Sequence, residues 1–172
     1  TYADNVNNGL VGKTIRDFIM FYNKYFSTFI DSIHFLPFFP SSGDGGFSVK
    51  NHEEIDPVFG NWEEIKELSK NANIMTDLVL NHASSEGKWF HNFKTGKSPG
   101  KDYFFTINNN YDYSNVIRPR DHDLLKEIKI LNDTKNLWCT FSYDQIDLNF
   151  RNPEVLLEFI TLILELSSYG VK

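Results

Sequence analysis

The residues best suited to chemistry are Asp77, Asn81 and His82, which stand within and just after the apolar run 73–80. A bare carboxylate inside a buried strand costs free energy, so Asp77 is predicted to have hydrogen-bonding partners. His82 can donate a hydrogen bond to a sugar hydroxyl or to a developing charge. Each residue alone is more often structural, but three such groups at the exit of one strand favour a functional site.

A second candidate is Asp44, which lies in the glycine-rich segment 42–47 after the short apolar run 32–37. On local grounds an aspartate among glycines is most often a turn residue. The functional alternative is that the glycines let the backbone approach a ligand, that Asp44 grips vicinal sugar hydroxyls, and that Phe47 forms an apolar wall. The pair Asp4–Asn5 is equally consistent with a simple turn.

These candidates need strands and helices to position them. Apolar residues three and four apart predict an amphipathic helix over residues 13–29. The runs 32–37 and 73–80 predict buried strands, which makes His34 a buried core histidine. Asn61, with Glu64 three residues later, predicts a capped helix start.

The rest of the chain completes the pattern. Asn152-Pro153-Glu154 predicts a helix that runs to about Ser168 and ends at Gly170, followed by the start of a strand at Val171. Alternating helices and strands predict parallel βαβ units. The expected fold is therefore α/β, a partial (β/α)8 TIM barrel with about three βα units, cut at both ends inside strands. The predicted domains are the first part of the barrel (1–80), an inserted subdomain (81–150), and the third helix with the next strand (151–172).

Composition narrows the function classes. The chain has 172 residues and a net charge of −6, with 41% hydrophobic residues. A nucleic-acid partner would need a basic face, and the pair Arg118 and Arg120 is too short to provide one. No stretch approaches the roughly 20 apolar residues of a membrane span. The single cysteine, Cys139, excludes an internal disulfide and is predicted to be buried, which favours a reducing, cytoplasmic compartment.

Several of these segments resemble one family. Asp77-x-Val79-x-Asn81-His82 is similar to the first signature region of the α-amylase superfamily (glycoside hydrolase family 13). The segments that resemble its sucrose-phosphorylase branch are 33–40, 43–47, 56–62, 81–84, 117–120 and 138–148. The resemblance covers essentially the whole chain. Within the branch, residues 149–158 most resemble phosphorylases that act on glucosylglycerate.

The resemblance implies roles for the sugar-binding residues. Asp44 and His82 match the pair that holds the glucosyl hydroxyls, and Phe47 matches the apolar platform beside that sugar. Arg120 matches an arginine that reaches the acceptor side, although a surface charge paired with a neighbouring aspartate is the structural alternative. Gln145 matches a glutamine of the acceptor site.

The resemblance also implies which residues only support the site. Asp77 matches a structural carboxylate behind it. Asn81 matches a calcium ligand of calcium-dependent amylases, but the phosphorylase branch does without the ion. We therefore expect no metal and no cofactor, and no membrane or nucleic-acid partner.

The family reaction is a retaining double displacement that passes a glucosyl group from an α-glucoside to inorganic phosphate. The family's nucleophile, acid and stabilising carboxylate would all lie beyond this chain, which is expected to be inactive alone. The alternatives left open are a hydrolase or transglucosidase of the same superfamily and a non-catalytic sugar-binding module. The donor glucoside and the oligomeric state are not predicted.

Overall fold

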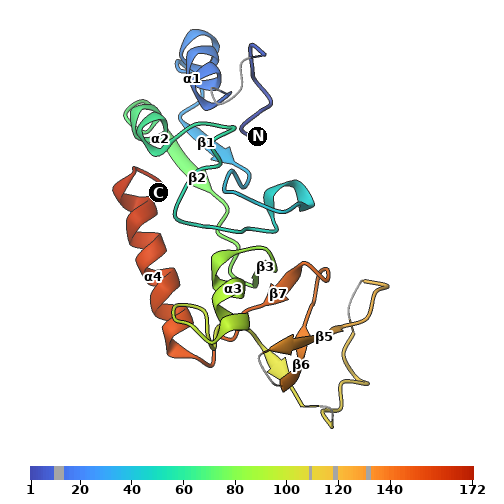
Figure 1. Ribbon diagram of the computed structural model, residues 1–172. Helices are drawn as coiled ribbons and strands as arrows, with labels where there is room; N and C mark the ends of the chain where they lie inside the picture. Colours follow the sequence, from blue (N-terminus) through green and yellow to red (C-terminus); the bar gives the residue numbers. More distant parts are fainter. Residues whose placement is uncertain (10–13, 109, 118–119, 131–132) are drawn as a thin grey trace. The chain divides into compact units, whose positions relative to one another are not determined.

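The computed structural model describes residues 1–172 apart from 10–13, 109, 118–119 and 131–132. These residues form two compact units (Figure 1). The first unit comprises Thr1–Phe47, Asn51–Leu78 and Phe159–Lys172. The second unit comprises Ser48–Lys50 and Val79–Glu158.

The first unit is built around a small parallel sheet. Strand β1 (Ser32–Phe35) pairs in parallel with β2 (Asn73–Thr76), in a register that sets Ser32 opposite Asn73. On the far edge of β1, the backbone N–H of Leu36 donates to the carbonyl oxygen of Thr1 at 2.9 Å. On the far edge of β2, Val171 forms a parallel bridge with Ile74. Four chain segments therefore lie side by side in the order expected of a βα barrel.

Helices cover this sheet. The unit contains α1 (Thr14–Tyr25) and α2 (Trp62–Leu68), together with most of the long helix α4 (Pro153–Ser168). The predicted cap of α2 is confirmed, because Asn61 and Glu64 form a reciprocal capping box. Lys13, where the first helix was predicted to begin, lies outside the described residues.

Apolar side chains hold the first unit together. Its fully buried members include Ile15, Phe35, Phe38, Phe39, Ile65, Leu68 and Ile74. Trp62 of α2 stacks on Tyr169 just after α4, with ring centroids 4.5 Å apart and planes 8° from parallel. Burial of this kind contributes about 1.5–3 kcal/mol for each large side chain.

Both predicted strands are longer than the observed ones, and the prediction for His34 is wrong. The strand predicted over 73–80 ends at Thr76, so Asp77 follows the strand instead of standing inside it. Its partner β1 stops two residues before Pro37, which has no N–H to continue a ladder. His34 is not a buried core histidine, because its side chain is 45% exposed. Ile33 and Phe35 occupy the buried face of β1, and alternation turns His34 to the other face.

The described residues of the second unit form two small antiparallel sheets, one whole helix and the first turns of α4. Strand β3 (His82–Ser84) pairs with β7 (Gln145–Asp147). Strands β4 (Thr106–Ile107), β6 (Asp133–Trp138) and β5 (Leu125–Ile130) form a sheet in the order β4-β6-β5. Helix α3 (Lys88–Thr95) packs Phe90 and Phe93 around Phe104. Cys139 is fully buried, as predicted.

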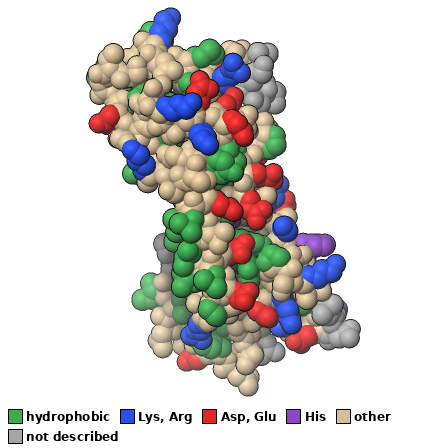
Figure 2. Space-filling model, turned by 90° about the vertical axis from the view of Figure 1, so that its left-hand side faces the viewer, with side chains coloured by type: hydrophobic (Ala, Val, Ile, Leu, Met, Phe, Trp, Pro, Cys, Tyr) green, Lys and Arg blue, Asp and Glu red, His purple; other side chains and the backbone are tan. Residues whose placement is uncertain are grey.

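Helix α4 confirms the predicted start at Pro153 and the end before Gly170, which has a φ of 90°. Its buried side is formed by Val155, Phe159, Leu162 and Leu166. The other side exposes Leu156, Leu157, Ile160, Ile163 and Leu164. Hydrophobic side chains gather along this part of the chain in Figure 2. Among the described residues, no helix combines the length and the apolar character needed to cross a bilayer.

Candidate active site

The turn that carries Asp44 depends on left-handed backbone. Asp44 has a φ of 55°, Gly45 of 60° and Gly46 of 99°, in the short helical turn η1 (Asp44–Gly46). A Cβ on Gly46 would lie 2.6 Å from the carbonyl oxygen of Pro37. The glycines therefore fold the turn tightly against the segment that follows β1. As a result Asp44 is exposed and Phe47, just after the turn, is half-buried.

Asp77 has the partner that its position requires. Its Oδ2 lies 3.0 Å from Nε2 of His34, and the two side chains are 31% and 45% exposed. In the sheet register His34 pairs with Met75, and Asp77 follows Met75 by two residues on the same face. Sequence reasoning missed this pair because it assigned His34 to the core, although the register of the two strands is the signal that finds it.

In the second unit, Phe141 brings two of the expected sugar-site residues together. The ring of His82 lies 5.0 Å from the ring of Phe141, measured between centroids. The guanidinium carbon of Arg120 lies 5.7 Å from the same phenyl centroid. A cation over an aromatic face is stabilised by about 0.5–1 kcal/mol at an exposed site. A guanidinium and an imidazole thus contact the same phenyl ring, and both groups can bind a phosphate or a carboxylate.

A second imidazole, that of His122, lies between two backbone carbonyl oxygens, one of which is in the loop that carries Phe141. Nε2 of His122 lies 2.7 Å from the carbonyl oxygen of Phe141, and its Nδ1 lies 2.7 Å from that of Asp123. Lys126 donates to the carbonyl oxygen of Tyr143 at 2.8 Å. The segment that follows Arg120 is thereby tied to the loop 141–143. Arg118, the other arginine of this segment, lies outside the described residues.

The carboxylate of Asp147, to which the sequence analysis gave no role, lies next to His82. Asp147 lies opposite His82 in the β3–β7 pair. It accepts hydrogen bonds from the backbone N–H and the hydroxyl of Thr140 at 3.0 and 2.7 Å, and one from the side chain of Asn81. Burial raises the pKa of Asp147 above its ordinary value, against the opposing effects of the Thr140 and Asn81 hydrogen bonds and of the His82 charge.

Asn81 is part of the same hydrogen-bonding group. Its Nδ2 lies 3.5 Å from Nδ1 of His82, and its carbonyl oxygen accepts from the N–H of Leu148 at 2.8 Å. The amide therefore links the carboxylate of Asp147 to the imidazole. Within the part of the chain that the structure describes, no group of three or more His, Cys, Asp or Glu side chains is arranged to hold a metal ion.

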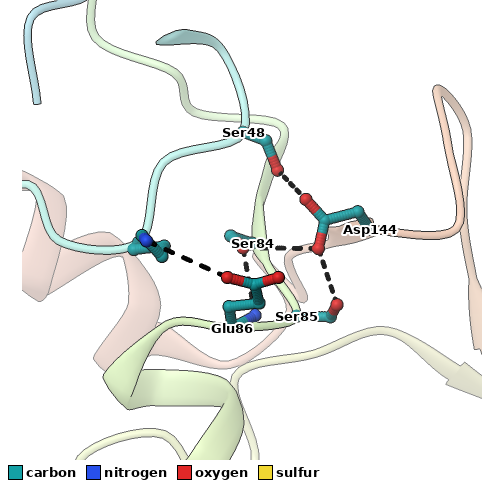
Figure 3. A network of polar contacts seen from close by, with 6 residues as sticks. Ser48, Ser84, Ser85, Glu86 and Asp144 are labelled. Carbon is teal, nitrogen blue, oxygen red and sulfur yellow. Dashed lines mark hydrogen bonds and ion pairs between the residues drawn. The ribbon is translucent and has the colours of Figure 1, made fainter. Parts of the chain in front are cut away.

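Gln145 lies in the interior of the second unit, with 2% of its surface exposed. It pairs with Ser84 across β3 and β7. The residue before it, Asp144, accepts hydrogen bonds from the hydroxyls of three serines, as Figure 3 shows. The serines are Ser48, Ser84 and Ser85. This cluster also escaped sequence reasoning, because no spacing rule relates a serine at 48 to an aspartate at 144.

The expected site residues thus divide between the units. Asp44, Phe47 and Asp77 belong to the first. The others belong to the second, where His82 and Arg120 contact Phe141 and Asn81 forms a hydrogen bond with Asp147.

Comparison with known proteins identifies the family. Residues 24–170 match the family model described as the alpha amylase catalytic domain. A glucosylglycerate phosphorylase of Spirochaeta thermophila is 40% identical over 152 residues, which is 88% of this chain and 26% of that protein. A glucosylglycerate phosphorylase of Escherichia coli is 37% identical over 165 residues, which is 95% of this chain and 29% of that protein.

A solved structure of a phosphorylase is also similar to this chain. The crystal structure of sucrose 6F-phosphate phosphorylase from Thermoanaerobacter thermosaccharolyticum superposes with a TM-score of 0.86 at 32% identity. It covers 100% of this chain and 37% of that chain. This chain therefore spans between about a quarter and about two fifths of the length of these relatives. The match over 24–170, with the barrel-like order of segments, shows that the chain belongs to the α-amylase catalytic-domain family.

Proposed function

We propose that these 172 residues belong to a glucoside phosphorylase, which transfers a glucosyl group from an α-glucoside to inorganic phosphate and releases α-glucose 1-phosphate. The observation that carries the proposal is the placement of Arg120 and His82 on one phenyl ring, that of Phe141. A phosphorylase needs a fixed cation beside its sugar site, because the acceptor is an anion. The phosphorylases among its relatives support the same conclusion.

Each expected residue has a chemical task in this proposal. Asp44 accepts hydrogen bonds from glucosyl hydroxyls, and His82 donates to another hydroxyl of the same sugar. Phe47 covers an apolar face of the ring. Arg120 holds phosphate through charge-assisted hydrogen bonds, and Gln145 supports the acceptor side.

The reaction we propose is a retaining double displacement. A carboxylate attacks the anomeric carbon, an acid protonates the leaving group, and phosphate then takes the glucosyl group from the enzyme. We assign these carboxylates to parts of the whole protein outside the present 172 residues. Residues 1–80 and 151–172 would then be barrel, and residues 81–150 an inserted subdomain. On this view the purified 172-residue chain binds sugars weakly or not at all and has no turnover.

We further propose a glucosylglycerate-type donor. The support is that the two glucosylglycerate phosphorylases are 40% and 37% identical to this chain, whereas the sucrose 6F-phosphate phosphorylase from Thermoanaerobacterium thermosaccharolyticum is 33% identical over 191 residues. A donor with a glycerate carboxylate would also benefit from the charge of Arg120. The cytoplasmic location stays a prediction.

The test is an assay of the whole protein for α-glucose 1-phosphate, with glucosylglycerate and with sucrose, in the presence and absence of phosphate. We expect release that requires phosphate and is faster from glucosylglycerate. Faster release from sucrose would contradict the proposed donor and would still support the proposed phosphorolysis. Glucose release that is indifferent to phosphate would make the protein a hydrolase, and sugar binding without turnover would make it a binding module.

A further inference from the structure

Asp144 forms the centre of a polar cluster that joins three separate stretches of the chain. Its Oδ2 accepts a hydrogen bond from Ser48 at 2.5 Å, and its Oδ1 accepts from Ser85 at 2.7 Å and from Ser84 at 3.4 Å. Figure 3 shows the three hydroxyls pointing at the one carboxylate. Hydrogen bonds to an ionised acceptor are about twice as strong as neutral ones.

The backbone around Asp144 is tied to the same stretches. Its carbonyl oxygen accepts from the N–H of Ser85 at 2.7 Å, and the N–H of Ser84 donates to the carbonyl oxygen of Val49 at 2.9 Å. Ser48 and Ser84 are almost completely buried. A buried hydroxyl that loses its hydrogen-bond partner destabilises the folded state. The cluster therefore opposes the displacement of any one of the three stretches.

Each stretch of the cluster lies close in sequence to a residue that the proposed function places at the substrate. Ser84 and Ser85 follow His82 on and just after β3, and Asp144 directly precedes Gln145 on β7. Ser48 directly follows Phe47 in the sequence. The serines and Asp144 are thus each within three residues of a side chain to which the proposed function gives a sugar or acceptor contact.

We propose that Asp144 is a positioning residue for the substrate site, acting through Ser48, Ser84 and Ser85 without touching the substrate itself. The inference rests on the proposed function for the identity of the substrate. A carboxylate that accepts from three hydroxyls fixes the spacing of three segments before the ligand arrives. Preorganisation of this kind lowers the cost of binding and of reaching the transition state.

Two substitutions of Asp144 in the whole protein test this role. Asp144→Ala removes all three acceptor contacts and is expected to raise the KM for the glucoside between about 10-fold and 100-fold, the range produced by small displacements of substrate-positioning groups. Asp144→Asn is expected to lie much closer to the parent. Its amide oxygen still accepts from Ser85, and the hydroxyl of Ser48 can turn to accept from the amide nitrogen.

A matched control is available in the first unit. Asp17 is a buried carboxylate that, like Asp144, holds another segment of the chain, by accepting from the backbone and side-chain nitrogens of Asn8 at 3.0 Å each. Asp17→Ala is expected to lower the melting temperature and to leave the KM unchanged. An unchanged KM in folded Asp144→Ala, or an equal rise in Asp17→Ala, would overturn the proposal.

Ser85→Ala covers the case in which Asp144→Ala does not fold, since it deletes only one contact. It is expected to raise the KM in the same direction by a smaller factor, and to add little when combined with Asp144→Ala, because both changes delete one shared bond. An unchanged KM in Ser85→Ala would contradict the role.

A readout without turnover separates this inference from the proposed reaction. Amide hydrogen exchange of residues 82–85 and 145–147 is expected to accelerate in Asp144→Ala, or in Ser85→Ala if the former does not fold, and not in Asp17→Ala. If the parent makes no α-glucose 1-phosphate, the proposed function fails and exchange alone decides whether Asp144 holds these strands. Equal exchange in variant and parent would overturn the positioning role.

Discussion

The first unit presents Asp44 from a turn whose shape is set by backbone conformation, whereas the second unit holds His82 and Gln145 beside two half-buried carboxylates. In the first, Gly45 and Gly46 at positive φ bring the turn against Pro37. In the second, no such turn is needed, because strands β3 and β7 carry the side chains and Asp144 and Asp147 bind the loops around them.

This difference predicts two kinds of sensitivity. A turn fixed by glycine fails through steric clash, which no change of pH or salt relieves. A cluster fixed by carboxylates fails through lost hydrogen bonds and responds to protonation. The following substitutions compare the two, starting with the largest expected effect.

Gly46→Ala tests the turn. The added Cβ would stand 2.6 Å from the carbonyl oxygen of Pro37, on a residue with a φ of 99°. We expect a loss of about 2–4 kcal/mol of folding free energy, since strain and clash add. Urea unfolding of variant and parent measures the loss.

The matched control is Gly9→Ala, because Gly9 has a φ of 87° and no atom of the described residues lies within 4 Å of its Cβ position. It keeps the backbone strain and lacks the clash, so it is expected to cost about 1 kcal/mol. Equal losses in the two variants would show that the contact with Pro37 does not matter.

Asp147→Asn tests the carboxylate in the second unit. Burial raises the pKa of Asp147 above 3.8, so the folded state binds the proton more tightly than the unfolded state. The stability from this group is fully present below the unfolded pKa and is lost as pH rises through the folded pKa. The parent should therefore lose stability relative to Asp147→Asn as the pH rises from below 3.8 through the raised pKa of Asp147 towards neutrality.

Thermal melts of both proteins across that range provide the measurement. The asparagine cannot titrate, so groups that do not interact with Asp147 cancel in the difference between the two curves, which leaves Asp147 and its coupling to His82. At neutral pH the substitution itself changes the hydrogen bonds from Thr140, an effect of about 1 kcal/mol. A difference that stays constant with pH, or that favours the parent at high pH, would show that burial does not dominate at this site.

Asn61→Ala has the smallest expected effect and is confined to the first unit. It removes the cap that accepts from the N–H of Glu64 at 3.1 Å. Loss of such a cap costs about 1 kcal/mol. The substitution is expected to lower the melting temperature without changing the KM for the glucoside, and a changed KM would mean that α2 influences the site.

The regular elements could be predicted from the sequence because their signals are local. Apolar residues three and four apart define α1, and Asn152 with Pro153 starts α4 where it was expected. The capping box of α2 is visible in four consecutive residues. Each of these features depends only on residues that lie within one or two helical turns of each other in the sequence.

The polar clusters could not be predicted because they join distant positions. Ser48 and Asp144 are separated by 96 residues, and His34 and Asp77 by 43. Buried polar groups must find partners, so the sequence required a partner for Asp77 without naming it. The family resemblance gave roles to Asp44, His82 and Arg120, but these roles come from matched motifs and not from any pattern of spacing.

The measurement that tests the central claim most directly is the phosphate dependence of turnover in Arg120→Leu. Arg151→Leu is its control, because the Arg151 guanidinium lies 5.6 Å from the ring of Phe105 in a similar cation–π contact. We predict that Arg120→Leu raises the KM for phosphate by about 10-fold or more, as loss of charge-assisted hydrogen bonds requires, while Arg151→Leu leaves it unchanged. An unchanged KM for phosphate in Arg120→Leu would contradict the assignment of phosphate to this residue.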